Sequence, residues 1–359
     1  MNIIDAKKLI KNLWRLQIET GKRFCVEVES GPGVGKSQMV QQITEELKAE
    51  WEVPVKFSPE FLSTREQPDV AGYAIPSKDP VDGSAIMVRT FAPWMPRKGD
   101  PEYGIILLDE FRQAPPEVQK PAAELMLNGR VGESQLSINY FVMAASNRES
   151  DRSGVHRSLA FIENRRMLIK IEPSLDAWVD WAEREKVHMY AIAFAKAHPH
   201  LVFQDKVPDK SGPFCTPRTL VQMSYLIDQL PEPLMVEAAM GYLGEGTGAM
   251  FIAFMRLVDE LPSYEDVVKD PKKTLCPTKP DACYACVQML AYKLQPRHID
   301  QVFTFIMRMR KEFQISGLQA CLRQHPTIVN TTEFINWVKA PEVIELLTAA
   351  HRLDKEFPK

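Results

Sequence analysis

No run of apolar residues in the sequence approaches the roughly 20 residues that a membrane-spanning helix needs, and neither sign of charge is in large excess. The formal net charge is −3 over 359 residues, so no overall field favours nucleic acid or an anionic membrane. A local basic channel formed in an assembly stays compatible with this charge. The first residues, 1–8, carry a charged helical pattern in place of a signal peptide. These absences predict no membrane association and argue mildly against a dedicated DNA-binding protein.

Cysteines are few and irregularly spaced. The six thiols lack the spacing of a small disulfide-bonded scaffold, which predicts a reduced, cytoplasmic chain. Cys283 and Cys286 form one C-x-x-C pair, with Cys276 and Cys321 as further conceivable zinc ligands, but no second pair has a matching spacing. The helical pattern around Cys283 favours packing in a core, and zinc binding is the minor alternative.

The bulk composition is that of an ordinary globular protein, with 45% hydrophobic and 25% charged residues. The length suffices for two or three domains, each with its own core. Hydrophobic periodicity predicts helices at 5–19, 115–128 and 175–197 and a short strand at 53–57. A loop region dense in proline is expected to extend to about residue 100.

The strongest signal is a glycine-rich segment between a strand pattern at 24–30 and a helix pattern at 38–50. Its glycines let backbone N–H groups converge on phosphate oxygens at the helix N-terminus. Lys36 is expected to reach the β- and γ-phosphates, and the Ser37 hydroxyl to ligate Mg²⁺. Ser30 stands where the usual G-x-x-x-x-G-K-[ST] pattern has its first glycine. The residues predicted to bind the nucleotide are Gly31, Pro32, Gly33, Val34, Gly35, Lys36, Ser37 and Gln38.

A second signal is the apolar segment 104–108, which is followed by two acids, Asp109 and Glu110. The pattern predicts a buried parallel strand with its acids at the carboxyl edge, where open α/β sheets bind ligands. Asp109 is expected to support Mg²⁺, and Glu110 to accept a proton from, or orient, an attacking water. Taken alone, two acids that begin a helix explain the pattern equally well.

The segment Asp109-Glu-Phe-Arg-Gln-Ala-Pro-Pro-Glu-Val-Gln119 resembles the Walker B region of MoxR-type AAA+ ATPases, in the group that includes dynein-related proteins. Upstream, residues 57–62 and Asp69-Val-Ala-Gly72 resemble the part of that family that follows the second strand. The resemblance covers roughly residues 20–230. It implies an α/β AAA+ P-loop NTPase core, a parallel sheet flanked by helices, in a homo-oligomeric ring, expected to be a hexamer, with ATP bound between subunits.

The resemblance also assigns roles to polar residues further along. Asn147, at the end of an apolar strand pattern, matches the sensor 1 position, although an asparagine that caps a turn explains it too. Arg165 and Arg166 both fit the arginine finger that reaches the γ-phosphate of the neighbouring subunit, and the sequence does not decide between them. Arg218, in the first turn of a predicted helix, matches sensor 2.

The predicted domains are an AAA+ core at 1–172, an α-helical lid with sensor 2 at 173–260 and a helical C-terminal extension at 261–359. The expected function is ATP hydrolysis that remodels or activates a protein client or adaptor, which the resemblance suggests is a von Willebrand A-domain protein. A nucleic-acid motor or loader is a less favoured alternative, with a modest basic cluster at Arg297, Arg308, Arg310 and Lys311. A nucleotide-gated binding module with negligible turnover is a further alternative.

Overall fold

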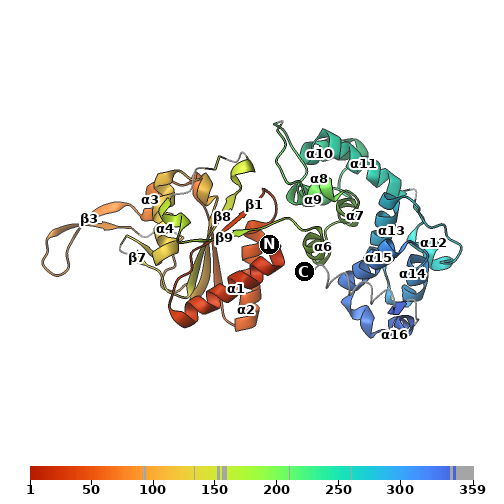
Figure 1. Cartoon of the computed structure of the whole chain (residues 1–359), viewed down its shortest axis with the longest axis horizontal. Helices are drawn as coiled ribbons and strands as arrows, with labels where there is room; N and C mark the ends of the chain where they lie inside the picture. The colour runs from red at the N-terminus through yellow and green to blue at the C-terminus, as the bar shows by residue number, and fades with distance from the viewer. Residues whose placement is uncertain are drawn as a thin grey trace. The chain divides into compact units, whose positions relative to one another are not determined.

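The computed structural model describes residues 1–90, 92, 94–132, 134–151, 154–155, 160–209, 211–259, 261–339 and 343–344. Its chain divides into two compact units. The first comprises residues 1–173 and 205–207, and the second comprises residues 174–204 together with the described residues that follow 207. Figure 1 labels most of the helices and several of the strands.

A five-stranded parallel sheet with the strand order β2-β5-β8-β1-β9 forms the centre of the first unit. Of its inner strands, β5 and β8 are apolar on both faces, as is usual for strands between two helical layers, whereas β1 carries two buried glutamates. In β5 all four residues from Ile105 to Leu108 are fully buried. The strands are β1 (Val26–Ser30), β2 (Val55–Phe61), β5 (Tyr103–Asp109), β8 (Tyr140–Asn147) and β9 (Met167–Lys170).

Helices cover both faces of this sheet. On one face, α1 (Ile3–Thr20) and α2 (Lys36–Trp51) pack against alternate strand residues that include Ile105 and Leu107. On the other, α3 (Gln67–Ala71) and α4 (Pro116–Asn128) pack against Ile106 and Leu108. This arrangement confirms the predicted α/β fold class, a parallel sheet flanked by helices and followed by a helical part. Because all strands run in parallel, their carboxyl ends meet at one edge.

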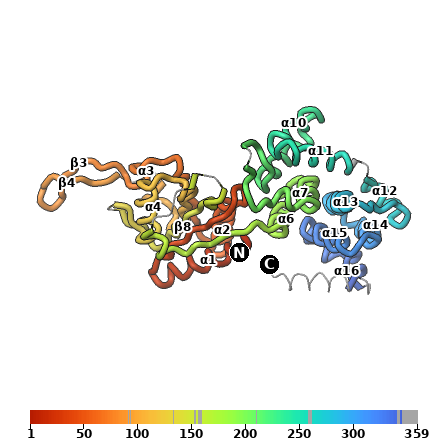
Figure 2. The backbone as a smooth tube through the Cα atoms, turned by 45° about the horizontal axis from the view of Figure 1, so that its top comes forward, coloured from red at the N-terminus to blue at the C-terminus, as the bar shows by residue number. Residues whose placement is uncertain are grey.

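Two parts of the first unit differ from the sequence prediction. The strand predicted at 53–57 is β2, which continues to Phe61 through Pro59; β2 is an edge strand, where a missing N–H is tolerated. Within the expected loop region lies an antiparallel hairpin that extends away from the sheet in both views (Figures 1 and 2). The remaining elements are β3 (Ala74–Lys78), β4 (Ala85–Arg89), β6 (Arg130–Val131), β7 (Ser134–Gln135) and α5 (Ala160–Glu163).

The second unit is helical. The helix predicted at 175–197 is two helices, because the chain turns at Lys186, which has a left-handed backbone (φ 56°). The described helices of this unit are α6 (Leu175–Arg184), α7 (Met189–Ala197), α8 (Pro199–Val202), α9 (Pro217–Ser224), α10 (Glu232–Leu243), α11 (Glu245–Asp259), α12 (Tyr264–Lys269), α13 (Pro280–Lys293), α14 (Ile299–Ile306), α15 (Lys311–Gln324) and α16 (Thr332–Val338). None of the described helices is long and apolar enough to cross a membrane.

Two apolar clusters fill this unit, and helix α13 contributes to both. Ala285 packs with the cluster of α7, α10 and α11, whereas Cys283 and Cys286 pack with that of α14 and α15. A buried polar contact crosses the same region: Glu183 of α6 accepts from Lys196 Nζ of α7 at 3.4 Å. Burial lowers the pKa of Lys196, and Glu183 opposes this. The boundary between lid and extension at residue 260 stays a prediction, since both parts lie in one compact unit.

Candidate active site

The glycine-rich loop connects the end of β1 to the start of α2. Gly35 precedes the helix with a left-handed backbone (φ 98°), a conformation that disfavours residues with a Cβ. Lys36 and Ser37 therefore lie in the first turn of α2, where backbone N–H groups have no partner within the helix. These donors and the positive end of the helix dipole make this point suited to an anion such as phosphate.

The register of the sheet brings Lys36 and Asn147 together, because Asn147 at the end of β8 lies opposite Ser30 at the end of β1. Lys36 Nζ donates to Asn147 Oδ1 at 2.7 Å and to the carbonyl oxygen of Gly31 at 3.2 Å. It also lies 3.3 Å from both the carbonyl and the hydroxyl oxygen of Ser30. The serine that replaces the usual first glycine thus supplies a contact to the loop lysine.

Ser37 and Asp109 form the other half of the site. The Ser37 hydroxyl donates to Asp109 Oδ2, and Asp109 Oδ1 accepts the backbone N–H of Glu110 at 2.9 Å. A hydroxyl oxygen beside a carboxylate is a donor set that fits Mg²⁺, a hard cation with oxygen ligands. The pair joins the first turn of α2 to the carboxyl end of β5.

Glu110 has an unusual backbone for its position. Its φ of 57° is left-handed, which costs on the order of 1–3 kcal/mol for a residue other than glycine. Its side chain accepts a hydrogen bond from the hydroxyl of Ser63, in the short turn Leu62–Thr64 that follows β2. Sequence reasoning missed Ser63, since nothing in a polar turn indicates contact with a residue 47 positions away.

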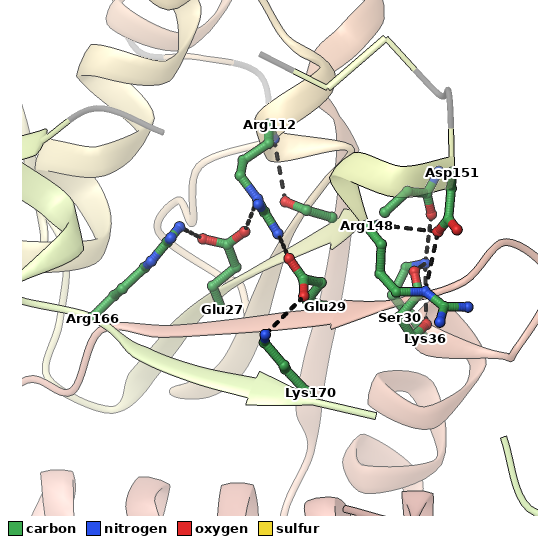
Figure 3. A network of polar contacts seen from close by, with 11 residues as sticks. Glu27, Glu29, Ser30, Lys36, Arg112, Arg148, Asp151, Arg166 and Lys170 are labelled. Carbon is green, nitrogen blue, oxygen red and sulfur yellow. Dashed lines mark hydrogen bonds and ion pairs between the residues drawn. The ribbon is translucent and has the colours of Figure 1, made fainter. Parts of the chain in front are cut away.

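The two candidate finger arginines occupy different environments. Arg166 is largely buried, with 7% of its side chain exposed, and it pairs with Glu27 of β1, which is fully buried (Figure 3). Arg165 is exposed, and among the described residues it makes one contact, from its backbone N–H to the carbonyl oxygen of Ile162. An arginine that must reach another subunit has to leave its own fold, so the burial of Arg166 favours Arg165 for that role.

Arg112, just beyond the Glu110 turn, belongs to the same buried ion cluster. Its Nε donates to Glu27 at 2.7 Å, and its Nη2 pairs with Glu29. Burial by itself lowers the pKa of Arg112, but Glu27 and Glu29 more than offset this, and the pKa is raised. The alternation Val-Glu-Val-Glu in a buried strand is the sequence signal that could have predicted cationic partners.

Arg218 lies in the first turn of α9, in the second unit, and is exposed. No carboxylate among the described residues pairs with it. Its predicted contact with the nucleotide stays a prediction.

The cysteines raised as zinc ligands pack in a core instead. Cys283 Sγ donates to the carbonyl oxygen of Pro277 at 3.2 Å, and Cys286 is fully buried. Across the described ranges, no group of three or more His, Cys, Asp or Glu side chains could hold a metal ion.

Taken together, the glycine-rich loop, the acidic end of β5 and the amide of β8 lie at the carboxyl edge of one parallel sheet. No family model matches the chain, and no curated protein does. Among solved structures, a mutant of RuvB from Thermotoga maritima is similar at 10% identity with a TM-score of 0.37, covering 76% of this chain and 77% of that one. PCH-2 of C. elegans is similar at 13% identity and a TM-score of 0.30, covering 69% and 66%. NtrX from Brucella abortus is similar at 14% identity and a TM-score of 0.30, covering 96% and 67%. At TM-scores this low, none of these similarities supports an inference about activity.

Proposed function

We propose that the protein is an ATPase of the AAA+ class. The observation that carries this proposal is the convergence of Lys36, Ser37, Asp109 and Asn147 at one edge of the sheet, with Glu110 directly after Asp109. A loop lysine in contact with a polar amide, beside a hydroxyl–carboxylate pair, supplies the groups that phosphoryl transfer needs for charge neutralisation and positioning.

Each side chain then has one task. Backbone N–H groups of Gly31 to Gly35 cradle the phosphates, and Pro32, Val34 and Gln38 complete the loop and the first helical turn. Lys36 and Asn147 hold the γ-phosphate. Ser37 and Asp109 would hold Mg²⁺, which when bound neutralises charge on the β- and γ-phosphates. Glu110 accepts the proton of the attacking water or orients it, and its contact with Ser63 keeps the carboxylate at the edge of the sheet.

Assembly into a homo-oligomeric ring, which we take to be a hexamer, would complete the site. Arg165 acts in trans on the γ-phosphate of the adjacent subunit; its exposure supports this assignment over the buried Arg166. Arg218 senses the nucleotide from the lid of its own subunit. The work of the ring, following the MoxR resemblance, is to remodel a protein client, for which a von Willebrand A-domain protein is the candidate. Six free thiols support a reducing compartment such as the cytoplasm.

Turnover of ATP by the assembled protein tests the proposal. The Glu110→Gln variant should bind ATP but hydrolyse it at least 100-fold more slowly than wild type, whereas the exposed Glu117→Gln on α4 should hydrolyse it normally. If wild type hydrolyses ATP no faster than Glu110→Gln, the protein is a binding module and the catalytic assignment is wrong. Stimulation of turnover by single- or double-stranded DNA or RNA would instead indicate a nucleic-acid motor.

The trans assignment has its own test. Subunits defective in Lys36 should regain turnover when mixed with subunits defective in Arg165, because some interfaces then contain one intact loop and one intact finger. Failure of rescue at every mixing ratio would remove Arg165 from the site.

A further inference from the structure

A further arginine, Arg148, lies at the phosphate-binding loop, although it belongs to neither of the elements that the loop connects. It directly follows Asn147 at the end of β8. A Cβ placed on Gly31 would lie 2.5 Å from Arg148 Nη2 and 3.5 Å from its Cζ, so the guanidinium rests directly against the first glycine of the loop. Figure 3 shows it at the same edge as Ser30 and Lys36.

Asp151 holds this side chain in place. Both the backbone N–H of Arg148, at 3.1 Å, and its Nε, at 3.3 Å, are directed at the same carboxylate oxygen, Asp151 Oδ2. Only 1% of the Asp151 side chain is exposed, so the carboxylate that holds Arg148 is itself fixed by its surroundings. Asp151 therefore lies on the Nε side of the Arg148 guanidinium. Within the described part of the chain, the two Nη groups donate no hydrogen bond.

We propose that Arg148 is a cis-acting ligand of the terminal phosphate, contacting the nucleotide bound by its own subunit; this inference rests on the proposed ATP binding. Lys36 and Asn147 define where the γ-phosphate lies, and Arg148 is the next residue along the chain from Asn147. A guanidinium with its Nε side held and its Nη groups available is suited to grip phosphate oxygens in a bidentate way.

The position of Gly31 fits this role. Any side chain at residue 31 would displace the guanidinium from the loop, so glycine there keeps the arginine against the backbone that cradles the phosphates. The usual P-loop glycine is absent one residue earlier, at Ser30, which is fully buried and contacts Lys36. Arg148 therefore adds positive charge at the position of the γ-phosphate, which ATP has and ADP lacks.

Equilibrium binding of fluorescent ADP and of a fluorescent, non-hydrolysable ATP analogue, each with Mg²⁺, tests the inference without relying on turnover. The variants are Arg148→Gln, Arg148→Lys and, as control, Arg130→Gln, an exposed arginine of the same unit. Arg148→Gln should weaken the triphosphate analogue roughly 10- to 100-fold, the loss expected for a hydrogen bond to a charged group. ADP affinity should change less than about 2-fold. Arg148→Lys should recover part of the loss, and Arg130→Gln should match wild type.

Equal weakening of both nucleotides, or no weakening of either, would overturn the inference and leave Arg148 as a structural partner of Asp151, while the ATPase proposal stands. Binding of neither nucleotide by wild type would refute the ATPase proposal, and the inference with it. The Gly31→Ala variant is a second test of the same contact, because it keeps the arginine and its contact with Asp151. It should reproduce the selective loss in wild type, yet add nothing to the Arg148→Gln variant. Additive losses in the double variant would contradict a shared contact.

Discussion

Removing the negative charge of Glu27 should destabilise the first unit more than any change at its surface. Glu27 is fully buried on β1 and faces two guanidinium groups, Arg112 at 2.7 Å and Arg166. With Glu29, the buried part of the cluster contains two carboxylates and two arginines and is close to neutral; Lys170, which lies 3.9 Å from Glu29, is exposed. Glu27→Gln keeps the shape but leaves one buried positive charge without compensation.

The magnitude follows from the geometry. Two unit charges about 4 Å apart attract by about 4 kcal/mol at an effective dielectric constant of about 20. Measured losses for breaking one side of a buried pair are about 3–5 kcal/mol, a large part of the roughly 5–15 kcal/mol that stabilises a typical domain. Arg166→Gln should cost a similar amount, since it leaves the opposite charge in excess. The double variant restores neutrality, so its loss should fall short of the sum by about 1–3 kcal/mol.

Hydrogen exchange of peptides from β1 and β9 measures this free energy of unfolding in the first unit alone, apart from the helical unit. Arg165→Gln is the matched control, because its side chain is exposed and should cost less than about 0.5 kcal/mol. If Arg166→Gln destabilises β9 no more than Arg165→Gln does, the buried cluster contributes nothing. Arg166 would then return as a candidate finger.

Two further predictions concern the metal and the thiols. Mg²⁺ should raise the affinity of wild type for ATP but leave the affinity of Ser37→Ala and of Asp109→Asn unchanged. ATP titrations with and without the metal measure this. An equal rise in all three proteins would remove Ser37 and Asp109 from the metal site. Burial raises the pKa of Cys215 and of Cys321 from 9.0 to about 12, so the folded chain keeps both thiol protons while the unfolded chain loses them above pH 9. Stability is therefore full below pH 9 and should fall between pH 9 and 12 by up to about 1.4 kcal/mol per thiol and pH unit. Urea unfolding at pH 8.5 and 10 should show the fall, and the same fall in a variant that carries Cys215→Ala and Cys321→Ala would contradict it.

Local periodicity was sufficient to predict the centre of the molecule. The strand before the loop, the helix after it and the acidic end of β5 each depend on a short run of residues, and a parallel sheet brings strand ends together without further information. The contact of Lys36 with Asn147, 111 residues away, follows from the pairing of β1 with β8.

What could not be predicted depends on partners that periodicity does not identify. The burial of Arg166 depends on Glu27, 139 residues earlier, and on the pairing of β1 with β9. The hairpin β3–β4 is largely exposed, and Pro76 in β3 is a residue that strands disfavour, although Ile86 and Val88 of β4 alternate as in a strand. The break at Lys186 lacks the glycine that usually ends a helix.

Helix α13 has a mechanical consequence for the second unit. Ala285 on α13 packs with the cluster of α7, α10 and α11, and Cys286 packs with that of α14 and α15. Packed protein interiors are stiff, so neither cluster can rotate without displacing the other. The contact of Glu183 with Lys196 ties α6, where this unit begins, to the same body. A rotation of α6 would therefore also move α14 and α15. We expect the described helices after residue 260 to move with α6 as one body.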